Sequence, residues 1–320
     1  SMKDRFGREI DYLRISITDR CNLRCVYCMP ENGIVQIPHK EILTYDEIIR
    51  ICRCMTDLGI RKIKLTGGEP LTRKGCATLV QMLKGLDGIN KVTLTTNGVL
   101  LKDQIRSLFE AGIDDINISL DTLDAETFAE ITGQDLLPEV LKSIDASLAA
   151  GLKVKVNAVS MPDTDWKRLL TLAKDKPVDV RFIELMPIGA GKESKGRSNE
   201  ELFKEILSEF PELQVDDSVH GAGPAVYYKI PGYQGSIGLI SAMHGKFCSS
   251  CNRVRLTSTG FLKTCLCYED GMDLRSILRG GSPEKLLDAM ARTIYGKPAE
   301  HCFEQPDQIT EAHGMSAIGG

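Results

Sequence analysis

Alternating apolar and polar residues mark six segments in the first 185 residues, and helix-like segments separate them. The alternation covers residues 12–18, 61–66, 91–96, 114–120, 152–159 and 178–185. Apolar residues recur at helical spacing in residues 44–58, 75–86, 102–111, 124–132, 138–150 and 165–175. Strands that alternate with helices form parallel βαβ units, so this order predicts an α/β fold, a partial (β/α)6 TIM-like barrel rather than a closed eight-fold one.

The polar positions of these strands include cations. Arg14 lies between Leu13 and Ile15, and Lys64 and Lys155 occupy equivalent positions in later strands. Successive side chains point to opposite faces of a strand, so we expect the apolar set to face the helices and the polar set to face the barrel interior. Buried cations without partners are costly, so this interior predicts a polar ligand. A solvated face on an antiparallel edge is the alternative, and the βαβ order disfavours it.

The last part of the chain has a different pattern. Residues 187–199 are rich in Gly, Ser and Lys and predict a mobile, lid-like loop, and a helix is expected at about 200–209. Short β-like segments follow at 226–230, 235–243 and 254–256. They predict an antiparallel appendage that closes the open side of the barrel. We therefore divide the chain into a barrel, residues 1–225, and an appendage, residues 226–320.

Composition narrows the class of protein. The 320 residues carry a formal net charge of −4, which gives no bulk attraction for nucleic acid or an anionic membrane. No apolar run approaches the roughly 20 residues that a membrane span needs. Eleven cysteines without a signal peptide indicate a reducing compartment, so we expect a cytoplasmic protein.

Three closely spaced cysteines follow the first strand. Cys25 lies four positions after Cys21, and Cys28 lies three positions after Cys25, a spacing that suits one soft metal centre. A four-iron cluster held by three thiolates leaves one iron open for chemistry. A zinc site would need a fourth ligand, and the next histidine, His39, lies beyond a turn. An odd number of cysteines disfavours disulfides. The spacing therefore predicts an iron–sulfur cluster.

A second cysteine set lies in the appendage, at Cys248, Cys251 and Cys265. Taken alone it fits zinc or iron–sulfur equally, and Cys267 or His244 could supply a fourth ligand. Beside the first set, we favour a second four-iron cluster with an open iron.

Arg253 and Arg255 lie between these cysteines, two residues apart on one strand face. Arginine suits phosphate recognition, whereas a pair of solvated surface arginines is the alternative. Their place beside the second cysteine set favours phosphate.

The predicted strands end in turns with polar or glycine-rich sequences. In α/β barrels the loops at the carboxyl ends of the strands form the active site. Besides the three-cysteine loop, these turns are Gly67-Gly68-Glu69-Pro70, Thr95-Thr96-Asn97-Gly98, Ser119-Leu120-Asp121 and Glu184-Leu185-Met186-Pro187.

The spacing Cys-x3-Cys-x2-Cys, with Tyr27 before the last cysteine, resembles the signature of radical S-adenosylmethionine enzymes. In that family, the three cysteines hold a [4Fe-4S] cluster whose open iron binds S-adenosylmethionine. The resemblance implies that one electron cleaves S-adenosylmethionine and yields a 5′-deoxyadenosyl radical.

The whole set of features resembles the GTP 3′,8-cyclase family of molybdenum cofactor biosynthesis over essentially the full chain. The features are the two cysteine sets, Gly-Gly-Glu-Pro, Arg253-Val254-Arg255 and the pair Gly319-Gly320. The resemblance implies a lyase whose deoxyadenosyl radical abstracts hydrogen from C3′ of GTP before C3′ bonds to C8, giving (8S)-3′,8-cyclo-7,8-dihydro-GTP. It also implies two [4Fe-4S] clusters, an external one-electron reductant and a homodimer.

The resemblance carries over to individual positions. It implies that Cys21, Cys25 and Cys28 hold the radical-generating cluster, and that Cys248, Cys251 and Cys265 hold the auxiliary one. S-adenosylmethionine is expected at Tyr27, Gly68, Ser119 and Met186. GTP is expected at Arg14, Lys64, Thr95, Lys155, Arg181, Arg253, Val254 and Arg255. Gly319 and Gly320 are expected to reach into the active site. Lys64 departs from the family pattern, which commonly has Arg there, so the bidentate fork is lost.

Three other functions compete with this interpretation. Another twin-cluster radical S-adenosylmethionine enzyme, such as a peptide modifier, would leave the Arg-Val-Arg and Gly-Gly features unexplained. A non-catalytic iron–sulfur electron carrier would need no polar barrel interior. A zinc-stabilised binding protein would be colourless, whereas four-iron clusters are brown.

Overall fold

The computed structural model describes residues 2–25, 37–185, 196–218, 225–241, 252–264 and 271–296. Its centre is a curved 12-stranded sheet with the order β14-β13-β12-β3-β4-β5-β6-β7-β8-β11-β10-β9. The first six strands of its parallel part are β3 (Tyr12–Ser16), β4 (Lys62–Thr66), β5 (Lys91–Thr96), β6 (Asp115–Ser119), β7 (Lys153–Ser160) and β8 (Val178–Glu184). These strands lie within two residues of the six predicted from the alternation, and each pairs parallel with the next.

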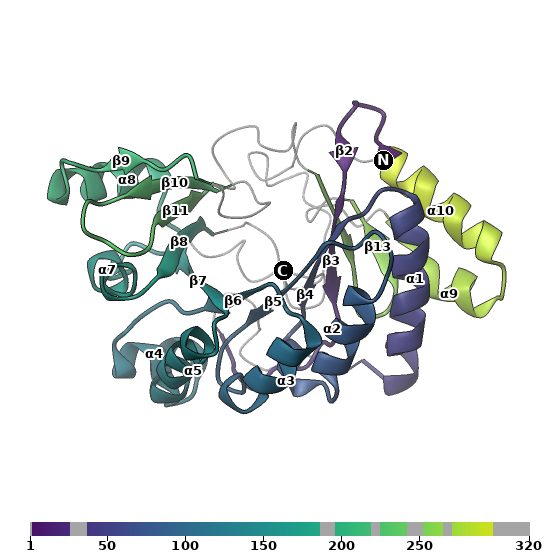
Figure 1. Cartoon of the computed structure of the whole chain (residues 1–320), viewed down its shortest axis with the longest axis horizontal. Helices are drawn as coiled ribbons and strands as arrows, with labels where there is room; N and C mark the ends of the chain where they lie inside the picture. The colour runs from purple at the N-terminus through teal and green to yellow at the C-terminus, as the bar shows by residue number, and fades with distance from the viewer. Residues whose placement is uncertain are drawn as a thin grey trace.

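Helices cover the outer face of this sheet (Figure 1). They are α1 (Tyr45–Asp57), α2 (Cys76–Lys84), α3 (Ile105–Ala111), α4 (Ala125–Thr132), α5 (Leu137–Ala149), α6 (Trp166–Leu169) and α7 (Thr171–Asp175). The helix predicted at 165–175 is thus divided into two short ones. The predicted start of α1 is confirmed, because the Thr44 hydroxyl accepts from the Glu47 amide at 3.1 Å and the Glu47 carboxylate accepts from the Thr44 amide at 3.0 Å. This capping box satisfies two amide groups that the helix would otherwise leave unpaired.

The later segments extend the same sheet at both edges. They are α8 (Asn199–Glu209), β9 (Gln214–Val215), β10 (Val226–Lys229), β11 (Ile237–Ile240), β12 (Arg253–Leu256), β13 (Phe261–Lys263), β14 (Gly271–Asp273), α9 (Leu274–Arg279) and α10 (Pro283–Tyr295). A separate small sheet pairs β1 (Met2–Lys3) with β2 (Glu9–Ile10).

The predicted antiparallel pairing of the appendage is confirmed for β10 with β11, β12 with β13 and β13 with β14. β9, which lies before residue 226, also pairs antiparallel with β10 and was not predicted. The strands that pair with the other side of β11 and β12 were not predicted from the sequence. There β11 pairs parallel with β8, and β12 pairs parallel with β3. An edge strand presents unpaired backbone groups to a neighbour in either direction, so alternation alone does not set strand direction. Because one sheet runs through both parts of the chain, the division at residue 225 stays a prediction.

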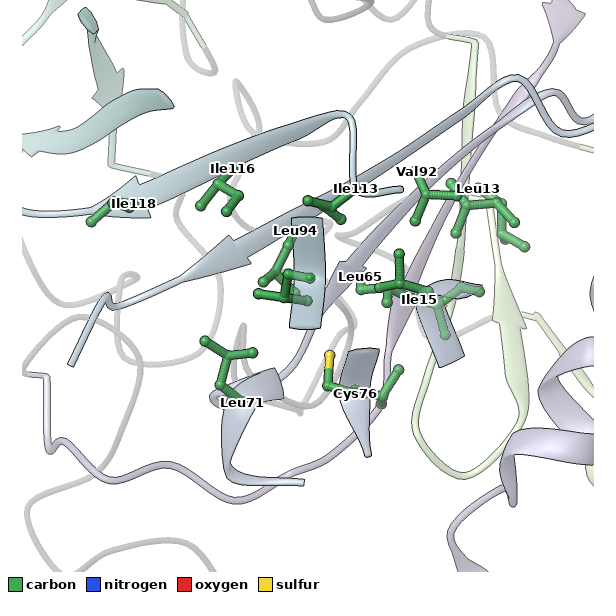
Figure 2. Close-up of a cluster of buried hydrophobic side chains, with 14 of the residues drawn as sticks. Leu13, Ile15, Leu65, Leu71, Cys76, Val92, Leu94, Ile113, Ile116 and Ile118 are labelled. Atoms are coloured by element: carbon green, nitrogen blue, oxygen red, sulfur yellow. The ribbon is translucent and has the colours of Figure 1, made fainter. Parts of the chain in front are cut away.

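The apolar side chains of the strands pack against the helices, as the alternation predicts. Figure 2 shows part of this core, which includes Leu13, Ile15, Leu65, Leu94 and Cys76. These five residues are at most 1% exposed. Burying one leucine or isoleucine side chain contributes about 1.5–3 kcal/mol to folding. The apolar face of the sheet therefore anchors the helices, and the opposite face is left to polar residues.

Within the described ranges, none of the helices combines the length and the apolar character that crossing a membrane requires.

Candidate active site

Cations from neighbouring strands meet on the inner face of the sheet. In the strand register Arg14 on β3 lies opposite Lys64 on β4 and Arg255 on β12, and Arg255 lies opposite Lys263 on β13. Arg14, Arg255 and Lys263 are all less than a tenth exposed. The register thus brings three predicted GTP-contacting residues together. Lys263 joins them although the sequence analysis did not select it; its alternation with Leu262 was the available signal.

Two more cations extend this group along the sheet. Asn117 on β6 lies opposite Lys155 on β7, and Asn157 on β7 lies opposite Arg181 on β8. Lys155 and Arg181 are 8% and 7% exposed. Arg253 on β12 acts electrostatically on Lys64 and belongs to the same group. We call these residues the cation cluster: Arg14, Lys64, Lys155, Arg181, Arg253, Arg255 and Lys263.

Burial and nearby cations lower the pKa of two lysines in this cluster, Lys64 and Lys155. Burial, reinforced by Arg14, Arg181 and the other nearby cations, holds the pKa of Lys64 well below its usual range. Burial and the Arg181 guanidinium lower the pKa of Lys155 to about 8. Among the described residues, no carboxylate forms an ion pair with Lys64, Lys155 or Arg181. An anion that carries several charges would offset this repulsion and raise both pKa values.

Polar neighbours fix the guanidinium of Arg181. Its Nε donates to Asn157 Oδ1 at 2.7 Å, and its Nη1 makes a long hydrogen bond of 3.5 Å to the Tyr227 hydroxyl. Gly238 leaves space for both side chains, since a Cβ there would lie 2.9 Å from Arg181 Cγ and 2.9 Å from Tyr227 Cε1. Tyr227 was not selected from the sequence, because its strand, β10, joins this part of the sheet only through β11 in the folded chain.

Cysteines lie at the carboxyl end of β3, in the part of the three-cysteine loop that the structure describes. Cys21 and Cys25 are half-buried. The Leu23 amide donates to Cys21 Sγ at 3.5 Å, and Asn97 Nδ2 lies 3.8 Å from the same sulfur. Burial, together with nearby Glu69 and Cys25, raises the pKa of Cys21 to about 11 against the lowering effect of these donors. Soft sulfur donors side by side fit iron, which binds the deprotonated form.

Two neighbouring segments hold the cysteine loop in place. The Arg24 amide donates to the Thr132 carbonyl at 2.8 Å, and Gln134 Nε2 donates to the Asn22 carbonyl at 2.8 Å. Asn22 Oδ1 also accepts from Asn97 Nδ2 at 2.7 Å. The end of α4 and the turn after β5 thereby fix the start of the loop.

The turn Gly67-Gly68-Glu69 is joined to the segment before the cysteines. The Gly68 amide donates to the Thr18 carbonyl at 3.0 Å, and the Glu69 amide donates to the Arg20 carbonyl at 2.7 Å. A Cβ on Gly68 would lie 2.0 Å from the Arg20 carbonyl oxygen. Glycine is therefore required at position 68 by the contact between two loops.

Glu69 is a buried carboxylate at the centre of these turns. It is 1% exposed, and it accepts from the Thr96 hydroxyl at 2.8 Å and from the Asn97 amide at 2.6 Å. It also accepts from the Leu71 amide at 2.9 Å. Burial raises the pKa of Glu69 to about 7 despite these donors. Glu69 thus ties β4 to β5 and keeps a negative or readily ionised group beside Cys21.

The other predicted site residues fall into three groups. Ser119 is exposed at the carboxyl end of β6, and Thr95 on β5 is half-buried, with a hydroxyl that has no hydrogen-bond partner among the described residues. Val254 is fully buried in the apolar core, so its side chain faces away from the cation cluster. Outside the described residues lie Tyr27, Cys28, Met186, Cys248, Cys251, Cys265, Gly319 and Gly320, as well as the alternative ligands His244 and Cys267 and most of the predicted loop at 187–199.

The donor set fits the cofactors as far as it is described. In the described ranges, no group of three or more His, Cys, Asp or Glu side chains could hold a metal ion, and two cysteines of the first set are present. The placement of Cys21 and Cys25 between the turns after β4 and β5 matches a site that would hold a cluster at the mouth of the barrel. Arg14 of the cation cluster lies on β3, the strand that precedes the cysteine loop.

The described site consists of parallel strands with cysteines at the carboxyl end of the first strand. Comparison with protein-family models shows the class of enzyme to which this arrangement belongs. The model of the radical SAM superfamily matches residues 15–175, and the model described as molybdenum cofactor synthesis C matches residues 178–303. SuiB from Streptococcus suis, solved with S-adenosylmethionine, has the same fold, with a TM-score of 0.64, 17% identity and coverage of 90% of this chain and 67% of that one.

Curated relatives narrow the assignment within that class. GTP 3′,8-cyclase from Clostridium perfringens (strain 13) is 44% identical over 323 residues, covering 100% of both chains. GTP 3′,8-cyclase from Alkaliphilus oremlandii is 44% identical over 331 residues, with the same coverage. The chain therefore belongs to the GTP 3′,8-cyclase family of the radical SAM superfamily.

Proposed function

We propose that this chain converts GTP to (8S)-3′,8-cyclo-7,8-dihydro-GTP in molybdopterin biosynthesis. Its membership of the GTP 3′,8-cyclase family and the molybdenum cofactor synthesis match support this reaction. The observation that carries the proposal is the cation cluster on one face of the sheet, which includes Arg14 on the strand that precedes the cysteine loop. A triphosphate is the part of GTP that such a cluster recognises.

In this proposal the residues of the chain divide the work. Arg14, Lys64, Lys155, Arg181 and the arginines of β12 hold the phosphates and so orient a flexible nucleotide. Cys21, Cys25 and Cys28 would hold one [4Fe-4S] cluster, and Cys248, Cys251 and Cys265 would hold a second. Gly68, Ser119, Tyr27 and Met186 would bind S-adenosylmethionine. When bound, these groups supply a 5′-deoxyadenosyl radical, which removes a hydrogen atom from C3′ of GTP.

The atoms balance as an isomerisation of the nucleotide. One hydrogen atom leaves C3′, a bond forms between C3′ and C8, and one electron and one proton return to the guanine. The product therefore has the mass of GTP. The role of the chain is to keep C3′ close to the adenosyl carbon and to exclude water until the bond has formed.

The proposal also covers the electron source, the oligomeric state, the location and the division of the chain. An external one-electron reductant must deliver electrons, because the family reaction consumes them. We also propose a homodimer, a cytoplasmic location and a functional division near residue 225. Reduced thiols that hold iron are compatible with the reducing conditions of that compartment.

The test is an anaerobic assay of protein reconstituted with iron and sulfide. With GTP, S-adenosylmethionine and dithionite, we expect 5′-deoxyadenosine to form only when GTP is present. We also expect a GTP-derived product with the mass of GTP and a different chromatographic retention. Deoxyadenosine formation that is independent of GTP would retain the radical chemistry and reject the substrate. No deoxyadenosine from protein that holds both clusters would reject the reaction class.

A further inference from the structure

One neutral side chain joins two members of the cation cluster. Asn117 lies on β6, midway between β4 and β8, and is 3% exposed. In the amide orientation that satisfies its neighbours, Asn117 Oδ1 accepts from Lys64 Nζ at 2.8 Å and from Arg181 Nη2 at 3.2 Å. A single carbonyl oxygen therefore fixes the separation between an ammonium and a guanidinium that otherwise repel each other.

Arg181 is held from three directions as a result. Asn157 accepts from its Nε, Asn117 from its Nη2, and Tyr227 from its Nη1. A guanidinium has five N–H groups, so these three contacts leave two for a ligand. Because the three acceptors are neutral groups, they orient Arg181 and leave its positive charge uncompensated.

The chemical type of residue 117 matters because an aspartate would have nearly the same shape. A carboxylate at this position would form ion pairs with Lys64 and Arg181, and it would remove most of their attraction for an anion. An apolar residue would leave both cations without their shared acceptor. Among these residue types, the amide alone keeps the two cations at a fixed separation with their charges available.

We infer that Asn117 is a positioning residue that sets Lys64 and Arg181 at a fixed spacing for the phosphates of the nucleotide. The inference rests on the proposed function, because it takes the triphosphate of GTP as the anion. Asn157 and Tyr227 complete the same arrangement on the Arg181 side. None of the three was selected from the sequence as a site residue.

The substitution Asn117→Asp tests this inference with the reconstituted protein that holds both clusters. We expect GTP to bind about 10- to 100-fold more weakly, because this factor corresponds to the loss of one or more charge-assisted hydrogen bonds. Affinity for GMP should fall less, because GMP brings fewer phosphate charges to the cation cluster. The midpoint of thermal unfolding without nucleotide should rise, because the new carboxylate relieves the repulsion. A defect in folding alone would lower both the stability and the affinity.

Asn90→Asp is the matched control, since Asn90 is exposed one residue before β5 and the change adds the same charge outside the cluster. It should bind GTP like the wild type. If Asn117→Asp does not fold, Asn117→Ser gives the second measurement. Its GTP affinity should fall while its iron–sulfur cluster content stays unchanged.

Equal GTP affinity of Asn117→Asp and wild type would overturn the inference, as would equal losses for GTP and GMP. Wild-type protein that holds both clusters and binds no GTP would instead reject the proposed function and the inference with it. The two failures are therefore distinguishable.

Discussion

A single methyl group at Gly68 tests how the turn after β4 supports the cysteine loop. In Gly68→Ala the new Cβ would lie 2.0 Å from the Arg20 carbonyl oxygen and 2.6 Å from the Arg20 carbonyl carbon. Real Cβ atoms essentially never come within 3.0 Å of another heavy atom, so the two loops must separate by about 1 Å. Such a shift would take the Gly68–Thr18 and Glu69–Arg20 hydrogen bonds, now 3.0 and 2.7 Å, past useful length.

The size of the effect follows from these two bonds. A typical hydrogen bond contributes about 0.5–1.5 kcal/mol net, so the variant should lose about 1–3 kcal/mol of its free energy of unfolding. Urea denaturation measures this loss, and iron analysis after reconstitution measures cluster loading, which should also fall because the cysteine loop moves. Gly85→Ala is the control, since a Cβ there meets only ordinary contacts at 3.4 and 3.5 Å in a right-handed helical conformation. The reasoning would be refuted if Gly68→Ala stayed within about 0.5 kcal/mol of the wild type with full cluster content.

Two further predictions concern pH. The pKa of Lys155 is about 8 in the free protein and that of Lys64 is also lowered, whereas a bound triphosphate would raise both pKa values. GTP binding should therefore take up protons. The affinity for GTP should fall above about pH 8, by up to about tenfold per pH unit for each titrating lysine. Calorimetry in buffers of different ionisation enthalpy measures the uptake, Lys64→Arg should reduce it, and GTP affinity that is constant from pH 7 to 9 would contradict it. The hydrogen bonds from Arg279 lower the pKa of Glu47 to about 2, so this contact contributes stability that is fully present above about pH 4.5 and is lost as the pH falls toward 2. Glu47→Gln keeps the capping-box acceptor and should cost about 1 kcal/mol at pH 7, a small value because the Arg279 side chain is 41% exposed; an equal loss at pH 7 and pH 3 in urea denaturation would refute it.

The strands and the direction of their faces were predictable from local alternation. Leu13 and Ile15 are buried against the helices, and Arg14 between them joins the cation cluster. The alternation could not reveal the neighbours of β11 and β12, because strand pairing between distant segments depends on which sheet edge is free. Those two strands add parallel to β8 and β3, and that pairing brings Arg255 beside Arg14.

The charged residues of the site could be predicted from the sequence. The neutral residues that orient those charges could not. Lys155 was selected from its strand and from the family resemblance, Arg181 from the family resemblance alone, and the register places them on the same face. Asn117, Asn157 and Tyr227 were not selected, because a polar residue on a strand carries no sign of which cation it will contact. Gly68 shows a different gap: its glycine is explained by packing against the Arg20 backbone, a contact between loops 48 positions apart in the chain that spacing alone could not predict.

The most direct test of the central claim is the transfer of a label from the substrate. GTP deuterated at C3′ is incubated anaerobically with the reconstituted protein, S-adenosylmethionine and dithionite, and the 5′-deoxyadenosine is analysed by mass spectrometry. A GTP 3′,8-cyclase must yield deoxyadenosine that carries one deuterium, together with a product that has lost it. Unlabelled deoxyadenosine from protein that holds both clusters and binds GTP would contradict hydrogen abstraction from C3′, and with it the proposed reaction.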